Sequence, residues 1–386
     1  MIAEDLKGGR RVDLGPGFFP VYAPSGHVLY QESVTSPNLW ALPFSLEVLE
    51  ATREPFPILV NARSPSIASG GTLVYVPSFK GRQKAVWVNR ENQEKEDTGL
   101  VAETISNIVL SPDGRLLAFV SMPEYGNREV WVYDLSRGSK TLLSRTVDTL
   151  SSNLTWSPDG EQVAFSTRRA GNWDILARQA DGSGEERVIL KTEQNERGSD
   201  WSRDGKYLLY NTVSSGVDRV GEDLWYLERN EDGSGWEPQP FLQTPFDEQG
   251  ARFSPDGRYV AYVSNESGQN EVYVRPFPEG GRKVTVSSNG GRQPRWSRDG
   301  KELFYVEGQT LLAVSVSSDS SFAVGSATPL FELPGLTSGA SARYSISPDG
   351  QRFVVVEFVG LGTETSESLI HVVENWYEEF RGRDQD

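Results

Sequence analysis

The amino-acid sequence predicts an all-β fold built from one short unit that recurs along the chain. The first observation is a tight turn, Ser157–Gly160, of the type Ser-Pro-Asp-Gly, with β-favouring residues on both sides. Pro presets φ at the first corner, Asp can bond its own backbone, and Gly accepts positive φ. The second observation is its recurrence. Clear copies end at Gly114, Gly160, Gly205, Gly257, Gly300 and Gly350, worn copies end at Gly26 and Gly71, and successive turns lie 43 to 52 residues apart.

The third observation is that each clear repeat offers four strand candidates, which we call a, b, c and d in chain order. In the fourth repeat they are Asn153–Trp156, Gln162–Thr167, Asp174–Arg178 and Arg187–Leu190. Short connections rich in turn residues join them, so neighbouring strands are antiparallel. Four strands in each of about eight units predict a β-propeller of four-stranded antiparallel blades. We expect eight blades, with seven as the alternative.

The repeats cover almost the whole chain, so we expect a single propeller domain over residues 1–386. The last repeat has no clear strand d, whereas a spare strand, Arg10–Leu14, precedes the first repeat. We therefore expect residues 1–14 to close the ring against the last blade. The repeats have these approximate bounds: 18–60, 61–103, 104–148, 149–195, 196–247, 248–291, 292–335 and 336–380.

Composition excludes several classes of function. The formal net charge of −16 argues against nucleic-acid binding, which needs concentrated Lys and Arg. Cysteine is absent, so disulfides and thiolate metal sites are excluded. No apolar run approaches the roughly 20 residues of a membrane-spanning helix, and the N-terminus lacks the apolar core of a signal peptide. We expect no membrane insertion by this chain, and a monomer.

Candidate catalytic residues are scarce. The chain has two histidines, His27 and His371, and no Gly-x-Ser-x-Gly elbow. The aspartates of the repeated turns follow Pro or Arg and precede Gly, which favours a turn role over a ring of carboxylates. We therefore expect no catalytic residue, no metal and no cofactor. The alternative is a propeller hydrolase or lyase with its active site in the central channel.

Binding is the better-supported expectation, because variable loops on a rigid frame commonly carry it. The d–a and b–c loops vary among the repeats, and strand a, nearest the axis, adds polar residues to the channel. Arginines gathered there could recognise carboxylates or the end of a peptide. The ligand would be a protein, a peptide or a small molecule, bound at the loop face or in the channel. The candidate residues are Arg168, Arg169, Trp173, Arg197, Asp200, Glu248, Arg252, Arg292, Arg295 and Arg343.

The Ser-Pro-Asp-Gly turns resemble the propeller repeats of the TolB type, also called WD40-like or PD40. Stretches such as Tyr262–Gly268, Val272–Pro278 and Trp296–Tyr305 also resemble the C-terminal propeller of bacterial membrane-anchored serine/threonine protein kinases. That resemblance implies a sensing or interaction module outside the cytoplasm of a bacterium. The kinase phosphate loop, His-Arg-Asp and Asp-Phe-Gly stretches are missing here, so kinase activity is not implied.

Overall fold

The computed structural model describes residues 1–5, 8–31, 38–59, 62–77, 82–122, 128–145, 153–168, 172–215, 220–318, 322–332, 343–359 and 370–380. The chain divides into two compact units, one formed by Met1–Gly81 with Gly360–Asp386 and the other by Arg82–Val359. Strands dominate both units, which confirms the all-β prediction. Within the described ranges, no helix is long and apolar enough to cross a membrane.

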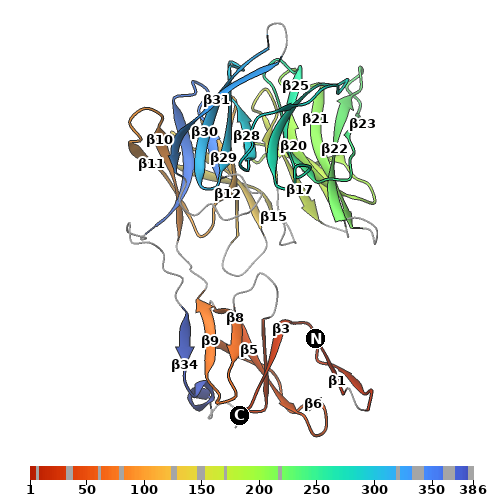
Figure 1. Ribbon diagram of the computed structural model, residues 1–386, viewed down its shortest axis with the longest axis vertical. Coiled ribbons are helices and arrows are strands. Elements are labelled where there is room, and N and C mark those ends of the chain that lie inside the picture. The colour runs from red at the N-terminus through yellow and green to blue at the C-terminus, as the bar shows by residue number, and fades with distance from the viewer. Residues whose placement is uncertain are drawn as a thin grey trace. The chain divides into compact units, whose positions relative to one another are not determined.

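The larger unit, Arg82–Val359, contains six four-stranded antiparallel sheets among its described residues (Figure 1). Five of these sheets take their strands consecutively from the sequence. They are β12 (Ser106–Leu110), β13 (Leu116–Ser121), β14 (Glu129–Asp134) and β15 (Ser139–Arg145); β16 (Leu154–Trp156), β17 (Gln162–Arg168), β18 (Trp173–Gln179) and β19 (Arg187–Leu190); β20 (Asn195–Trp201), β21 (Tyr207–Ser215), β22 (Val220–Arg229) and β23 (Trp236–Leu242); β24 (Glu248–Phe253), β25 (Tyr259–Ser264), β26 (Glu271–Pro276) and β27 (Val284–Thr285); and β28 (Arg292–Trp296), β29 (Glu302–Glu307), β30 (Thr310–Ser317) and β31 (Ala323–Glu332).

The sixth sheet, which we call the closing sheet, joins the two ends of this unit. Its order is β11 (Lys95–Ala102), β10 (Gln83–Asn89), β33 (Arg352–Phe358) and β32 (Tyr344–Ile346). β10 and β33 pair along their whole length, from Gln83 opposite Phe358 to Asn89 opposite Arg352. The two strands of the closing sheet that lie nearest the axis, β32 and β33, therefore come from the eighth repeat, and the two that lie farthest from it, β10 and β11, come from the second.

This pairing corrects the predicted closing strand. Arg10–Leu14 was expected to be the outermost strand of the last blade, but the two outer strands of the sheet that contains β33 are β10 and β11. Arg11–Asp13 (β2) pairs instead with Ile2–Glu4 (β1). The reversal between them contains Gly9 at a φ of 68°, a conformation that glycine adopts without steric strain. The expected count of eight blades is not confirmed, because the described strands of the first repeat lie outside the Arg82–Val359 unit.

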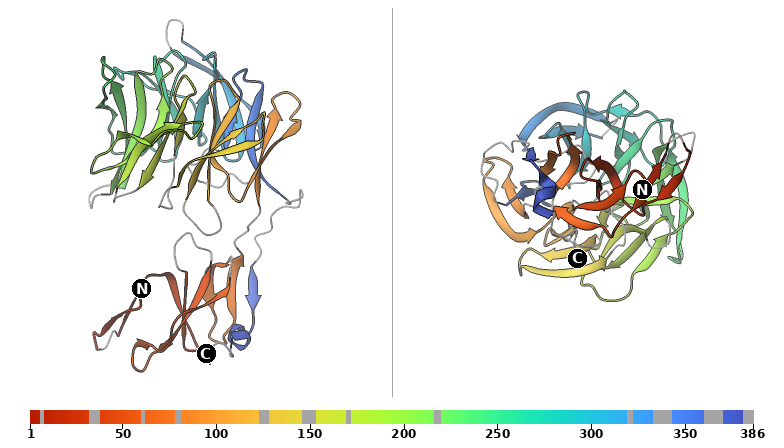
Figure 2. Two further views of the ribbon diagram at one scale, coloured as in Figure 1. Left: turned by 180° about the vertical axis from the view of Figure 1, so that it is seen from behind. Right: turned by 90° about the horizontal axis from the view of Figure 1, so that it is seen from below.

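Buried apolar clusters join each sheet of the larger unit to the next and so complete a ring. Phe165 of β17 packs with Val130 of β14, and further clusters join the following sheets in the same way. The last cluster unites Phe304 of β29 with Phe353 of β33, and another unites Val354 of β33 with Phe119 of β13. Seen from below in Figure 2, the sheets are arranged around a common centre. Apolar burial between neighbouring sheets therefore holds the ring together.

The repeated turns have the structure that their sequence predicts. In Ser347–Gly350, the Ser347 hydroxyl donates to Oδ1 of Asp349 at 2.5 Å, and the same oxygen accepts from the backbone N–H of Gln351 at 3.0 Å. Gly350 has a φ of 72°. The other five clear copies repeat the Ser–Asp bond at 2.5 to 2.7 Å. The prediction that these aspartates build turns is confirmed.

The smaller unit is built mainly from two sheets. One contains β3 (Phe18–Ala23), β4 (His27–Gln31), β5 (Leu39–Ser45), β6 (Glu50–Ala51) and β7 (Phe56–Leu59), and the other contains β8 (Ala62–Ile67), β9 (Leu73–Pro77) and β34 (His371–Val373). Trp376 of the 3₁₀ helix η1 (Trp376–Phe380) lies in their core, with 2% of its surface exposed. His27 is buried there against the rings of Phe56 and Trp376.

An arginine-lined pocket on the axis of the ring

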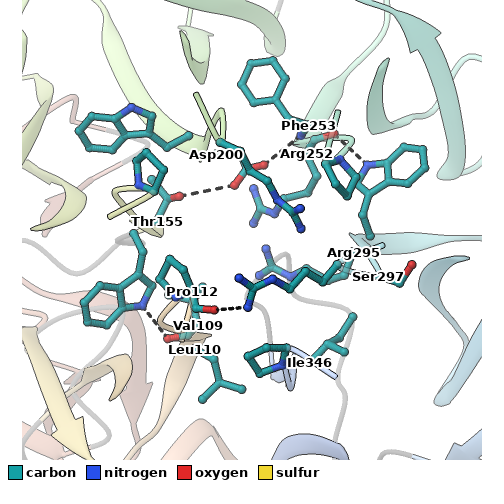
Figure 3. A pocket seen from close by; sticks show the side chains of 18 of the residues that line it. Val109, Leu110, Pro112, Thr155, Asp200, Arg252, Phe253, Arg295, Ser297 and Ile346 are labelled. Carbon is teal, nitrogen blue, oxygen red and sulfur yellow. Dashed lines mark hydrogen bonds between the residues drawn. The ribbon is translucent and has the colours of Figure 1, made fainter. Parts of the chain in front are cut away.

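A pocket of about 350 Å³ lies at the end of the ring where the a–b turns gather. We call it the axial pocket. All six sheets contribute to it. In each sheet, the strand nearest the axis, which we call the inner strand, ends at the pocket and is followed by one of the repeated turns. The residues just before the last one of the inner strands are Val109, Thr155, Asp200, Arg252 and Arg295; the last ones are Leu110, Trp156, Trp201, Phe253, Trp296 and Ile346; and the second turn residues are Pro112, Pro158, Arg203, Pro255, Arg298 and Pro348. Figure 3 shows the pocket.

The lining of the axial pocket is strongly cationic. It includes four arginines, Arg203, Arg252, Arg295 and Arg298, and a single acidic residue, Asp200. This excess of positive charge stands in a chain whose formal net charge is −16. The acidic residues elsewhere on the protein do not cancel the positive potential inside the pocket, because the low-dielectric walls of a cleft concentrate the electric field of the charges that line it. The pocket is therefore suited to attract anions.

The one carboxylate of the pocket is engaged by other partners. Oδ2 of Asp200 accepts a hydrogen bond from the backbone N–H of Phe253 at 2.9 Å, and Oδ1 accepts one from the Thr155 hydroxyl at 3.5 Å. Burial raises the pKa of Asp200, while the charges of Arg252 and Arg295 oppose that rise. Asp200 thus joins the inner strands of neighbouring sheets.

Arg252 and Arg295 keep hydrogen-bonding capacity. Nη1 of Arg252 donates to the carbonyl oxygens of Ser199 and Ala251, the latter at 2.8 Å. Nε of Arg252 and Nε of Arg295 have no hydrogen-bond partner among the described residues. The other two nitrogens of the Arg295 guanidinium also make no hydrogen bond to the described residues. Burial lowers the pKa of both guanidinium groups, and the charge of Arg295 lowers that of Arg252 further. An anion between them would relieve this repulsion.

The structure brings three of the predicted binding residues together in the axial pocket: Asp200, Arg252 and Arg295. Trp173 and Arg197 meet elsewhere, where the guanidinium lies 4.8 Å from the indole centroid and donates to Glu222 at 2.8 Å. Glu248 is buried and accepts a hydrogen bond from the Thr244 hydroxyl at 2.5 Å.

Three further predicted residues, Arg168, Arg292 and Arg343, are not part of the pocket lining. Arg292 donates to the carbonyl oxygen of Gly308 at 2.7 Å. Burial lowers the pKa of Arg343, which precedes β32. Arg168 is the last residue of β17, and Arg169 lies outside the described residues.

Two pocket residues, Arg203 and Arg298, escaped the sequence analysis. They occupy the second position of the repeated turn, where the other four clear copies have Pro. That replacement of Pro by Arg in two of the six copies was the available signal. It was missed because the turns were treated as uniform, and binding was assigned to the variable loops.

No arrangement of three or more His, Asp or Glu side chains suited to hold a metal ion is found in the described part of the chain. Both histidines belong to the smaller unit, where His371 Nδ1 lies 3.1 Å from the Tyr75 hydroxyl.

Comparisons with known proteins agree with this fold. Residues 50–226 match the family described as TolB beta propeller domain. An uncharacterized protein of Agrobacterium fabrum is 28% identical over 233 residues, which cover 55% of this chain and 73% of that protein. The Tol-Pal system protein TolB of Xanthomonas campestris is 30% identical over 128 residues, 33% of this chain but only 26% of that protein.

A solved structure from Agrobacterium tumefaciens, described as a TolB, shares the fold with a TM-score of 0.57. It is 20% identical, and the match covers 73% of this chain and 100% of that one.

Proposed function

This chain carries TolB-type β-propeller repeats, and we propose that it is a non-catalytic binding module whose ligand enters the axial pocket. The fold supports a binding or interaction role. The observation that carries the proposal is Arg295, a half-buried guanidinium that lines the pocket without a hydrogen bond or ion pair in the described part of the chain. Burying a charge is unfavourable unless it is paired, so such a group is suited to a ligand with a negative charge.

Ligand binding in the pocket can be followed by tryptophan fluorescence, because Trp156, Trp201 and Trp296 all line it. A suitable probe is 8-anilinonaphthalene-1-sulfonate, which combines an anionic group with an apolar body. We expect it to bind the folded chain at one site and to accept energy from these indoles. The titration reports a dissociation constant without knowledge of the natural ligand.

The effect of arginine substitutions on the affinity for the probe shows whether it binds in the axial pocket. The double variant Arg252→Ala/Arg295→Ala should weaken binding by about tenfold or more, because hydrogen bonds to charged groups contribute about 1.5–3 kcal/mol each. The matched control is Arg137→Ala/Arg282→Ala, which removes two exposed arginines outside the pocket. Equal affinities in the pocket variant and the control variant would overturn the proposal.

The proposal includes a cellular role as a sensor or interaction module of the bacterial cell envelope. Two things support that role: the TolB-type repeats, and a relative that is a Tol-Pal system protein. Fractionation of native cells, followed by immunodetection, tests the location. We expect the chain in the extracytoplasmic fraction, and recovery with cytoplasmic markers would contradict it.

A further inference from the structure

The axial pocket has two chemically different halves. All of its charged residues come from the three consecutive sheets that contain β20, β24 and β28. The three remaining sheets contribute a mostly apolar wall, in which Val109, Leu110 and Ile346 lie across the pocket from Asp200 and Arg252 (Figure 3). A ligand that fills the pocket must therefore satisfy a cationic side and an apolar side at once.

The cationic half is suited to a carboxylate. Arg252 and Arg295 stand at equivalent positions on neighbouring inner strands, and the carboxylate of Asp200 is already bonded to Phe253 and Thr155. A guanidinium presents its donors in a planar fork that matches the two oxygens of a carboxylate. Phosphate also binds arginine, but a fully hydrated inorganic anion would leave the apolar wall without a partner.

The apolar half is suited to a hydrocarbon group of limited size. A volume of about 350 Å³ is at the small end of the range of ligand pockets. The wall between the indole of Trp156 and the side chain of Ile346 is continued toward the turns by Pro112, Pro158 and Pro348, which offer no side-chain hydrogen bond. At its edge, the carbonyl oxygen of Pro112 accepts a hydrogen bond from Arg298 at 2.9 Å. Release of water from this wall would favour an apolar group.

We propose that the axial pocket binds an organic carboxylate, with the carboxylate on Arg252 and Arg295 and an attached apolar group on the wall that contains Ile346. Two sources present this chemistry, the C-terminus of a peptide that ends in an apolar residue and a free small carboxylic acid. The inference rests on the proposed function, because it specifies the ligand of the same pocket.

The test measures displacement of 8-anilinonaphthalene-1-sulfonate and, directly, the heat of binding. The competitors are N-acetyl-leucine, N-acetyl-leucinamide, N-acetyl-glycine, inorganic phosphate and the peptide Ala-Ala-Leu with a free or an amidated C-terminus. We expect the free acids to bind at least about tenfold more tightly than the amides, as loss of a charge-assisted pair predicts. We also expect N-acetyl-leucine to bind more tightly than N-acetyl-glycine.

Two variants separate the halves. Arg295→Gln removes the charge and keeps a polar amide on a shorter side chain, and it should reduce the preference for acid over amide while leaving the preference for leucine over glycine. Ile346→Ser should do the reverse. Thermal unfolding of both variants establishes that they are folded. A variant that changes both preferences equally would contradict the two-sided pocket.

The remaining outcomes divide clearly. Tighter binding of the free-acid peptide than of N-acetyl-leucine identifies a peptide C-terminus as the source, and equal binding identifies a small acid; both support the inference. Phosphate competing as well as N-acetyl-leucine would overturn it. If the probe still binds in an arginine-dependent way while no carboxylate displaces it, this inference fails and the proposed function stands.

Discussion

Nη1 of Arg298 lies 2.9 Å from the carbonyl oxygen of Pro112, although the two residues belong to sheets that are not neighbours in the ring. The closing sheet stands between them. Arg298 therefore reaches over the inner strands of that sheet and joins two turns at the mouth of the axial pocket. It is exposed, and its contact with Pro112 is the kind of surface hydrogen bond that contributes little to stability.

We expect Arg298→Ala to lower the free energy of unfolding by less than about 1 kcal/mol, because the Arg298 side chain is exposed. The same change should accelerate dissociation of 8-anilinonaphthalene-1-sulfonate, since it opens the pocket mouth and removes a positive charge. Stopped-flow fluorescence measures the dissociation rate, and urea unfolding measures the stability. Unchanged dissociation in a folded variant would show that Arg298 does not cover the pocket.

The ring should depend on the closing sheet and not on the N-terminal hairpin. Phe353 of β33 is fully buried against Phe304 of β29, so Phe353→Ala should destabilise the larger unit by about 3–5 kcal/mol. Removal of Met1–Leu14 should leave the unfolding transition of this unit unchanged, because its described closure is made by β10 and β33. Calorimetry of the full chain, the Phe353→Ala variant and the truncated chain measures the unfolding transition of each. A large loss on removing residues 1–14 would contradict this closure.

A forked ion pair supports the same closure. Nη1 and Nη2 of Arg90 donate to the two carboxylate oxygens of Glu302 at 2.7 and 2.6 Å, and these bonds raise the pKa of Arg90. Arg90 follows β10, whereas Glu302 begins β29 of the neighbouring sheet. A double-mutant cycle with Arg90→Ala and Glu302→Ala should give a coupling energy of about 0.5–1.5 kcal/mol, because the pair is partly exposed. Additive effects would show that the pair adds nothing to the closure.

The repeated turns should make the ring sensitive to acid. The hydroxyls of Ser297 and Ser347 lower the pKa of Asp299 and Asp349 below the ordinary value of 3.8. A pKa that is lower in the folded than in the unfolded chain adds stability above the unfolded value, and this stability is lost as pH falls through the folded value.

We therefore expect the free energy of unfolding to fall as the pH is lowered from 5 through about 3, the range in which aspartates titrate. The variant Ser297→Ala/Ser347→Ala should be less stable at neutral pH and should lose less further stability in acid. Urea unfolding across this pH range measures both slopes. Parallel pH profiles for the two proteins would rule out the Ser–Asp bonds as the cause.

The pocket arginines should favour binding at the expense of stability. Arg295 is half-buried and makes no hydrogen bond or salt bridge to the described residues, so Arg295→Met should leave the melting temperature unchanged or raise it. Addition of N-acetyl-leucine should raise the melting temperature of the unmodified chain and not that of the variant. A melting temperature well below that of the unmodified chain would assign Arg295 a structural role instead.

The sequence by itself determined the unit and its local chemistry. The order Ser-Pro-Asp-Gly specifies its own turn, because Pro, Asp and Gly each satisfy one local requirement of the backbone. The alternation of apolar residues likewise specifies antiparallel strands, as in Gln162–Arg168. Such short-range rules predicted the all-β, four-stranded architecture and three of the pocket residues.

Only the tertiary structure decided which strands close the ring and where the charges meet. β33 presents the same alternation to any partner strand, so its pairing with β10 follows from the packing of Phe353 and Val354 against both neighbouring sheets. Arg203 and Arg298 occupy ordinary turn positions, and they line one pocket only because the ring brings distant turns around one axis. Long-range pairing and convergence depend on the whole ring, which no local pattern encodes.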